Sequence, residues 1–230
     1  MIRTGLVQLH PPTFDATSLL ATYGVRLAAP RIWPDLLWRL PPLSGHDRVV
    51  YLTFDDGPTQ HTPRLLDTLA RYDARATFFL LGRQMDQHPH TVDLLLDAGH
   101  TLGNHGYTHP DPWRTPTAVL LAEFERTAQR LTGHIGQPPR WLRPPYGHFT
   151  RVLRAWGLSR RQRMVMWDVM PGDFLRGVTS RQITQRVLRT VRPGSIVVLH
   201  DNPNVAEVTP PALAALLSDL SADGWRFAAL

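Results

Sequence analysis

From Arg48 onward, short apolar runs alternate with longer amphipathic stretches along the rest of the sequence. Runs such as Val49–Phe54 and Ile196–Leu199 have the length and composition of buried strands. The intervening stretches have helical periodicity, and Thr62, Thr115 and either Thr179 or Ser180 stand where helix caps are expected. Repeated strand–helix units of this kind predict an α/β fold with a parallel sheet.

We expect strands near Val49–Phe54, Ala76–Leu80, Thr101–Gly103, Trp141–Leu142, Met164–Trp167, Ile196–Leu199 and Arg226–Ala229. We expect helices near Pro63–Tyr72, Thr91–Asp97, Thr117–Leu131, Arg151–Ala155, Arg181–Val191 and Pro211–Leu220. Strands and helices alternating in this way predict a closed or nearly closed (β/α)7–8 barrel. The 230 residues suit a single domain of that kind.

The first 47 residues differ in composition from the rest, since they are rich in proline and aromatic residues. Pro30, Pro34, Trp33 and Trp38 illustrate the pattern. Such a segment is too short and too irregular for a second domain. We therefore expect residues 1–47 to form an extension that packs on the outside of the barrel, and residues 48–230 to form the domain itself.

Composition limits the chemistry and the partners. The sequence has no cysteine, so a metal site would need histidine and carboxylate ligands. A net charge of +6 favours anionic partners such as nucleic acid, an anionic wall polymer or a membrane surface. No arginine cluster is interleaved with aromatic residues, however, so a solvated basic face is the simpler explanation and we expect no specific nucleic-acid partner.

The beginning of the sequence lacks the apolar core of a secretory signal, and no stretch approaches the roughly 18 apolar residues of a membrane span. We therefore expect no membrane span. A cytoplasmic location is the default expectation, and the cell envelope stays open as an alternative. The oligomeric state is not addressed by any sequence feature.

Reactive residues follow the predicted strands, at the point where each strand ends. They are Asp55 and Asp56 after the first strand, His105 and His109 after the third, Arg143 to Tyr146 after the fourth, Asp168 and Asp173 after the fifth, and His200 and Asp201 after the sixth. In a (β/α) barrel the carboxyl ends of the strands converge on one face, where active sites lie. We therefore expect these residues to meet in one site.

His105 and His109 are four residues apart, a recurring spacing of metal ligands. Gly106 and Pro110 favour a loop, where two histidines can also be ordinary surface residues. A carboxylate from a neighbouring strand end would complete a three-ligand site with open positions for water and substrate. Such a nitrogen and oxygen ligand set suits Zn²⁺ and also Co²⁺, Ni²⁺ or Mn²⁺.

The stretch YLTFDDGP places two carboxylates side by side at the end of a strand. Adjacent like charges are either solvated on a turn or held by a cation. Arg143 is expected to orient one of the two aspartates through a forked pair of hydrogen bonds. His200 is the candidate for an acid opposite an aspartate base, although a lone histidine at a strand end is often structural.

Five motifs occur in order: TFDDGP, GNHxxxHP, RPPYG, WDxxxxD and VLHD. Together they resemble the polysaccharide deacetylases of the NodB-homology type, carbohydrate esterase family 4, from Arg48 to Leu230. The family fold is a distorted (β/α) barrel, in agreement with the predicted strands. The resemblance implies metal-dependent removal of acetyl groups from N-acetylated sugars of a chitin-like or peptidoglycan-like poly- or oligosaccharide, with release of acetate. Zinc is the expected metal.

The resemblance also implies a role for each matching residue. Asp55 corresponds to the general base, and Asp56, His105 and His109 correspond to the metal ligands. Arg143 corresponds to the arginine that holds the base, and Pro145 and Tyr146 correspond to the groove wall, where the Tyr146 N–H binds the oxyanion. His200 corresponds to the general acid, and Asp173 corresponds to the carboxylate that tunes the pKa of this histidine. The sequence departs from the family pattern at Gly106, Met170, Phe174 and Val198. None of these is a ligand, base or acid, so we expect an active enzyme with an altered groove and rate.

Two alternatives to a deacetylase stay open at this stage. The same barrel could hydrolyse another C–N bond, as relatives acting on cyclic amides or ureides do. A catalytically silent module that binds glycans or anions through the basic surface is the other alternative. Among substrates, chitin fragments, peptidoglycan, another N-acetylated wall polymer and O-acetylated xylan are all compatible with the motifs, since loop shape decides between them.

Overall fold

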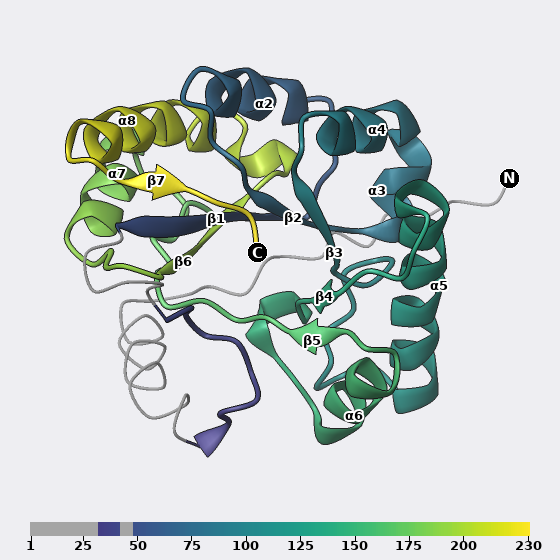
Figure 1. Cartoon of the computed structure of the whole chain (residues 1–230). Helices are drawn as coiled ribbons and strands as arrows, with labels where there is room; N and C mark the ends of the chain where they lie inside the picture. Colours follow the sequence, from purple (N-terminus) through teal and green to yellow (C-terminus); the bar gives the residue numbers. More distant parts are fainter. Residues whose placement is uncertain (1–31, 42–47) are drawn as a thin grey trace, which may run out of the picture. The chain divides into compact units, whose positions relative to one another are not determined.

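The computed structural model describes residues 32–41 and 48–230. The chain divides into two units, Met1–Pro34 and Asp35–Leu230, and the second unit contains all the elements considered below. Its strands are β1 (Val49–Asp55), β2 (Thr77–Leu80), β3 (Thr101–Asn104), β4 (Trp141–Leu142), β5 (Arg163–Met164), β6 (Ile196–His200) and β7 (Arg226–Phe227). They form one parallel sheet in the order β5-β4-β3-β2-β1-β6, with β7 also paired to β1 (Figure 1).

Helices pack around the outside of this sheet (Figure 1). They are α2 (Thr62–Ala70), α3 (Gly82–Gln87), α4 (Pro89–Asp97), α5 (Thr117–Ile135), α6 (Arg151–Ser159), α7 (Ser180–Leu188) and α8 (Thr209–Ala222), with short 3₁₀ turns η1 (Pro145–Gly147) and η2 (Pro203–Val205). Among the described residues, none of these helices combines the length and the apolar character needed to cross a bilayer. Helix α3 was not expected from the sequence.

The helix starts were only partly predicted. Thr179 caps α7 as expected, in a reciprocal capping box with Gln182. Thr62 and Thr115 do not cap their helices, since α2 begins after His61 and α5 after Pro116, without a side-chain cap. Thr62 instead donates a hydrogen bond to Asp201, 2.6 Å away, so its hydroxyl links the first residue of α2 to the loop after β6.

The predicted barrel is confirmed as an open, distorted one. Strands β5 and β6 at the two edges of the sheet do not pair directly. Isolated bridges lie between them: Leu37 pairs with Val165, Arg39 with Ser195, and Val169 with Val197. The expected strand Met164–Trp167 was wrong in extent. The Val165 N–H still donates to Leu142 of β4 at 2.8 Å, but the next residue, Met166, donates instead to Leu37 at 2.8 Å.

Most of the predicted extension over residues 1–47 lies outside the described residues, at 1–31 and 42–47. Within the described part, Leu36, Leu37 and Trp38 are buried. Leu37 exchanges backbone hydrogen bonds with Met164 and Met166, at 3.0 and 2.8 Å. This short segment therefore lies in the gap between the two edge strands, β5 and β6, which we call the seam of the barrel.

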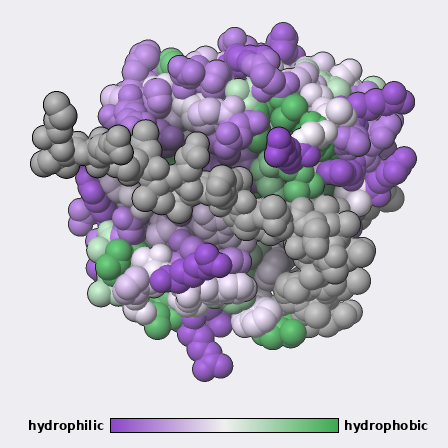
Figure 2. All heavy atoms as spheres, turned by 180° about the vertical axis from the view of Figure 1, so that it is seen from behind, coloured by the Kyte–Doolittle hydropathy of each residue, from purple (hydrophilic) through white to green (hydrophobic). Residues whose placement is uncertain are grey.

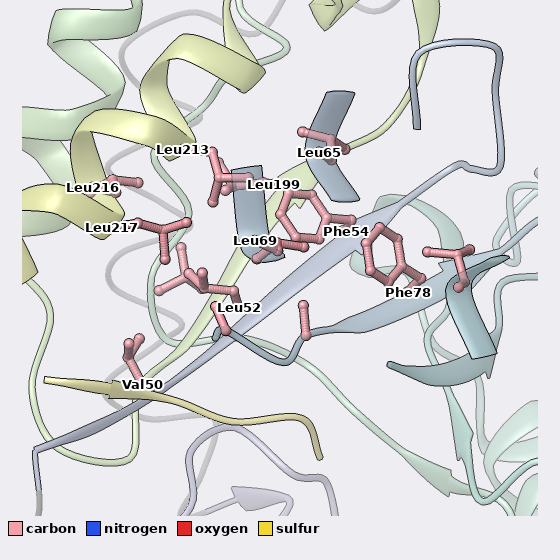
Figure 3. Close-up of a cluster of buried hydrophobic side chains, with 14 of the residues drawn as sticks. Val50, Leu52, Phe54, Leu65, Leu69, Phe78, Leu199, Leu213, Leu216 and Leu217 are labelled. Atoms are coloured by element: carbon pink, nitrogen blue, oxygen red, sulfur yellow. The ribbon is translucent and has the colours of Figure 1, made fainter. Parts of the chain in front are cut away.

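The main hydrophobic core lies between the sheet and helices α2 and α8 (Figure 3). Leu52 and Phe54 of β1 point toward Leu65 and Leu69 of α2, and Phe54 stacks on Phe78 at 4.9 Å (Figure 3). Successive residues of a strand face opposite sides. Burying Leu52 and Phe54 on the helix side therefore turns Thr53 and Asp55 into the barrel.

The surface opposite the view of Figure 1 is mainly hydrophilic, with smaller hydrophobic patches (Figure 2). Large hydrophobic side chains that the described part exposes are Ile32, Trp113, Val119, Tyr146, Val152 and Leu158. Scattered exposed apolar residues are normal for a soluble surface. Two of them, Trp113 and Tyr146, are aromatic and lie on the loops that follow β3 and β4.

Candidate active site

The carboxyl ends of β1, β3, β4 and β6 bring most of the predicted site residues together. Asp55 and His200 are direct partners in the β1–β6 register, and Asn104, just before His105, pairs with Leu142, just before Arg143. Asp168 is the exception. It accepts hydrogen bonds from the Ser195 hydroxyl and the Ile196 N–H at 3.0 and 2.9 Å, so it holds the barrel seam.

Asp56, His105 and His109 form a cluster whose candidate ligand atoms all lie within 4.8 Å of one another. Asp56 Oδ1 is 3.6 Å from His105 Nε2 and 3.4 Å from His109 Nε2. This oxygen is buried and has no hydrogen-bond partner among the described residues. A buried, unpaired carboxylate oxygen facing two imidazole nitrogens is costly without a cation. The three residues therefore fit a divalent metal ion.

The tautomer of His105 and the protonation state of His109 also suit a metal. His105 Nδ1 donates to the Arg143 carbonyl oxygen at 2.7 Å, which leaves the Nε2 lone pair facing Asp56. Burial lowers the pKa of His109 to about 4, so its imidazole is neutral at physiological pH. Burial by itself would raise the pKa of Asp56, but the neighbouring imidazoles, His109 foremost, lower it overall. Neutral imidazoles and an ionised carboxylate are the forms that bind metals.

The loop that carries the two histidines contains a residue, Gly106, whose backbone conformation favours glycine. Gly106 has φ +81, and a Cβ there would lie 2.9 Å from the Pro110 ring. Glycine is therefore suited to the position where the family pattern has a larger residue. Thr108 donates from both its N–H and its hydroxyl to Glu123 of α5, at 2.7 and 2.9 Å. These bonds fix the loop to the helix.

Asp55 is held by a buried arginine. Arg143 Nη1 donates to Asp55 Oδ1 at 2.8 Å, and both side chains are almost fully buried. The expected forked pair was wrong, because Nη2 of Arg143 donates instead to the Met166 carbonyl at 2.9 Å. Arg143 also donates to the Thr53 hydroxyl at 2.7 Å. The second oxygen, Asp55 Oδ2, is not bound by Arg143 and lies 3.9 Å from His105 Nε2.

His200 is oriented by Asp173. His200 Nδ1 and the His200 backbone N–H donate to the two oxygens of Asp173 at 2.8 and 2.7 Å. Burial by itself would lower the pKa of His200, but Asp173 and then Asp56 and Asp55 raise it to about 9. The ring of Phe174 packs edge-on against the imidazole at 5.1 Å. His200 is therefore a fixed imidazolium at neutral pH.

Pro145 and Tyr146 lie in the turn η1 next to the cluster of Asp56, His105 and His109. Pro145 is buried, whereas Tyr146 is 45% exposed. Tyr146 has φ 60, a left-handed conformation that is unusual for a bulky residue. Its ring packs edge-on against His109 with the ring centres 4.5 Å apart. The strained turn thus presents Tyr146 at the mouth of the site.

One further residue of the site, Asn202, was missed from the sequence, and Asp201 was expected in the site without an assigned role. Asn202 Nδ2 donates to Asp56 Oδ2 at 2.8 Å, and Asn202 Oδ1 accepts the Asn204 N–H at 3.0 Å. Because the amide oxygen is already used, the amide nitrogen must face Asp56. Buried Asp201 accepts hydrogen bonds from Thr59 and Thr62 and donates its N–H to the Asp55 carbonyl. The only sequence signal for Asn202 is its place two residues after His200.

Comparison with known proteins gives consistent results. The sequence matches the family described as polysaccharide deacetylase over residues 43–159. It is 34% identical over 183 residues to a peptidoglycan-N-acetylglucosamine deacetylase of Bacillus cereus, covering 79% of this chain and 66% of the relative. It is 38% identical over 156 residues to a chitooligosaccharide deacetylase of a Bradyrhizobium species, covering 67% and 71%.

One solved structure of a deacetylase is similar to this structure over a larger part of the chain. The Bc1960 peptidoglycan N-acetylglucosamine deacetylase, in complex with 4-naphthalen-1-yl-N-oxidanyl-benzamide, superimposes with a TM-score of 0.80 at 30% identity, covering 86% of this chain and 93% of that one. The metal dependence of the family agrees with the Asp56, His105 and His109 cluster. The chain belongs to the NodB-type polysaccharide deacetylase family, carbohydrate esterase family 4.

Proposed function

We propose that this protein is a metal-dependent deacetylase that removes acetyl groups from N-acetylated sugars of a chitin-like or peptidoglycan-like glycan and releases acetate. The observation that carries the proposal is the buried Asp56 Oδ1, unpaired within the described part of the chain and facing two histidines. Asp55, which is bound by Arg143, lies at the carboxyl end of β1, and His200, which is bound by Asp173, lies at the carboxyl end of the neighbouring strand β6. The relatives described as deacetylases of peptidoglycan and chitooligosaccharides support the substrate class.

Asp56, His105 and His109 would hold the metal ion. Two imidazole nitrogens and one carboxylate oxygen favour Zn²⁺, and Co²⁺, Ni²⁺ or Mn²⁺ suit the same set. A divalent ion bound there would supply Lewis acidity toward the acetamide carbonyl and would lower the pKa of a water molecule.

Asp55 acts as the general base in this proposal. Arg143 holds Oδ1 by a hydrogen bond, and Oδ2 is left to take the proton of the attacking water. The Tyr146 N–H donates a hydrogen bond to the developing oxyanion, and Pro145 forms the adjoining wall of the groove.

His200 acts as the general acid. Because its Nδ1 is bonded to Asp173, the opposite nitrogen, Nε2, carries the proton that is delivered to the departing amine. The amine leaves as a neutral or protonated group rather than as an anion, which lowers the barrier to cleaving the C–N bond. Acetate and the free amino sugar are the products.

Mass spectrometry of acetylated oligosaccharides tests the proposal. Protein reloaded with Zn²⁺, Co²⁺ or Ni²⁺ is expected to remove acetyl groups from N-acetylglucosamine oligomers or from peptidoglycan fragments. Turnover of cyclic amides or ureides instead would favour the other C–N hydrolase. If the protein bound no divalent metal and chelators changed nothing, the enzyme assignment would be wrong and a silent binding module would be favoured.

The acid role of His200 predicts a specific pH dependence. Activity needs protonated His200, so kcat/KM is expected to fall as the pH rises through about 9. In Asp173→Asn this alkaline limb should move down by at least about one pH unit, because the leading charge that raises the pKa is lost. Steady-state pH profiles of both proteins measure the shift. Identical alkaline limbs would mean that another group is the acid.

The same pKa shift is linked to stability. The pKa of His200 is higher in the folded protein than the roughly 6.5 of an unfolded chain, so protonation favours the folded state. This contribution is complete below about pH 6.5 and is lost as the pH rises through about 9. Denaturant titrations across this range should show a smaller loss of stability in Asp173→Asn than in the wild type.

Asn202 is expected to support the metal site by orienting Asp56. Asn202→Ala removes the donor to Asp56 Oδ2, so the carboxylate is free to rotate, and metal affinity should fall about tenfold to a hundredfold. Competition with a chromogenic chelator measures the affinity, and Co²⁺ absorption reports the ligand geometry. Asn204→Ala is the matched control, because it keeps the backbone N–H that holds Asn202. Equal affinities in all three proteins would contradict this role.

A further inference from the structure

Asp201 is a buried carboxylate beside the active site that has no part in the proposed reaction. It directly follows His200 at the end of β6 and is only 3% exposed. Asp201 Oδ1 accepts a hydrogen bond from the Thr59 hydroxyl at 3.0 Å, and Oδ2 accepts one from the Thr62 hydroxyl at 2.6 Å. Both threonines are buried as well. The carboxylate therefore binds the segment between β1 and α2 at two points.

The hydroxyl groups in this network have fixed directions. The Thr59 N–H donates to the Thr62 hydroxyl oxygen at 2.7 Å, and the His61 N–H donates to the Thr59 hydroxyl oxygen at 3.1 Å. Burial raises the pKa of Asp201 to about 6, although the hydrogen bonds from Thr62 and Thr59 lower it. At neutral pH the carboxylate is thus ionised and can accept both hydroxyl protons, which an amide nitrogen cannot do.

Asp56, the candidate metal ligand, lies between two places where Asp201 holds the chain. Before Asp56, the Asp201 backbone N–H donates to the Asp55 carbonyl oxygen at 2.8 Å. After Asp56, a Cβ on Gly57 would lie only 2.5 Å from Asp201 Oδ2, so the carboxylate packs directly against this glycine. The two contacts confine the backbone on both sides of Asp56.

The backbone of Asp56 needs such support. Its φ is +77, in the left-handed region that residues with a side chain rarely adopt. A residue in this region keeps its conformation only where the surrounding structure holds it. The backbone conformation of Asp56 sets the direction of its carboxylate, whose Oδ1 faces His105 and His109. A change in this backbone would therefore turn Oδ1 away from the two histidines.

We propose that Asp201 is a positioning residue of the metal site, which holds the chain on both sides of Asp56 so that the Asp56 carboxylate faces the two histidines. This proposal rests on the proposed metal-dependent function and adds to it a residue that contacts neither the metal ion nor the substrate. A side-chain variant of Asp201 keeps its backbone N–H and all three candidate ligands. Its effect on metal binding therefore measures the carboxylate alone.

Metal affinity at neutral pH tests the proposal. By competition with a chromogenic chelator, Asp201→Asn is expected to bind Zn²⁺ about tenfold more weakly than the wild type. The Co²⁺ absorption spectrum should also change, because the ligand geometry is altered although no ligand is lost. A saturating concentration of Zn²⁺ should restore most of the turnover of Asp201→Asn, which it could not do if the carboxylate took part in the chemical step.

Variants of Thr62 test the same network from the other side. Thr62→Val removes the hydroxyl that donates to Asp201 Oδ2 and should also weaken Zn²⁺ binding, whereas Thr62→Ser keeps a hydroxyl and should bind Zn²⁺ nearly as the wild type does. Thr68→Val is the matched control, because Thr68 is a buried threonine of the same helix whose hydroxyl donates to the Arg64 carbonyl within α2. If Asp201→Asn failed to fold, this series would decide.

Hydrogen exchange of the metal-free proteins tests the positioning role without the metal. In the wild type the amides of Thr59 and His61 are hydrogen-bonded, so a peptide covering residues 55–62 should exchange slowly. In Asp201→Asn and Thr62→Val this peptide should exchange about tenfold faster, with the later turns of α2 unchanged.

The outcomes separate this proposal from the deacetylase itself. Unchanged Zn²⁺ affinity, Co²⁺ spectrum and exchange in Asp201→Asn would overturn the positioning role and leave the deacetylase intact. An equal loss of affinity in Thr68→Val would overturn it too, since the loss would then follow from any change in the packing of α2. If the wild type bound no divalent metal, the deacetylase would be wrong, and hydrogen exchange would still decide whether Asp201 holds the chain around Asp56.

Discussion

Asp56→Ala is expected to abolish the metal site. The variant removes the only carboxylate of the described cluster, so Zn²⁺ affinity should fall by at least about a hundredfold and turnover should be lost with it. Metal content after dialysis and competition with a chelator measure the affinity, and acetate release measures turnover. The fold should survive, because the variant also removes a buried oxygen that lacks a hydrogen bond within the described part of the chain.

Metal-free protein provides the control for this variant. Metal-free Asp56→Ala is expected to unfold at the same denaturant concentration as metal-free wild type or at a higher one, and added Zn²⁺ should stabilise only the wild type. Asp67→Ala, on the exposed face of α2, should behave as the wild type in every assay. Tight Zn²⁺ binding by Asp56→Ala would show that the metal lies elsewhere.

Asp55→Asn is expected to keep the metal and lose turnover. Asparagine can still accept the hydrogen bond of Arg143, but it cannot take a proton from water. The rate of acetate release should fall by about a thousandfold, within the usual range for the loss of a general base. Zn²⁺ affinity should change much less than in Asp56→Ala, because Asp55 is not a member of the predicted ligand set. Single-turnover kinetics on the Zn²⁺-loaded protein measure the chemical step directly.

This variant should also reduce stability, because Arg143 loses its counter-charge while fully buried. The free energy of unfolding is expected to fall by on the order of 3 kcal/mol. Arg143 keeps its bonds to Thr53 and Met166, so the protein should remain folded. Formate, a small carboxylate, is expected to restore part of the turnover of Asp55→Ala. Full activity of Asp55→Asn would exclude Asp55 as the base.

Much of the fold could be predicted because its signals are local. Buried parallel strands are short apolar runs, and helices have apolar residues at a period near 3.6, so both can be recognised without their partners. The strand β1 and the long helix α5 were expected within a few residues of their observed bounds. The short helix α3 lacks a clear period, and Arg163–Met164 is shorter than its apolar run because the pairing partner changes.

The membership of the candidate site could also be predicted to a large extent. Asp55, Asp56, His105, His109, Arg143 and His200 all follow strands whose carboxyl ends converge in any parallel barrel. Their catalytic and ligand roles stay predictions until the variants are measured. Asn202 could not be recognised, and Asp201 could be placed in the site but given no role, since the role of an amide or a carboxylate after a strand depends on the residue opposite it.

The sequence by itself determined the order of strands and helices, the strand ends that carry reactive residues, and the family to which the chain belongs. Only the tertiary structure decided which atoms meet. It showed that Arg143 bonds Asp55 through one nitrogen, that Asn202 orients Asp56, and that Trp113 stacks on His148 beside the site. The physical reason is that periodicity and motif order are properties of neighbouring residues along the chain, whereas hydrogen bonds and ring contacts between distant segments depend on how the whole barrel packs.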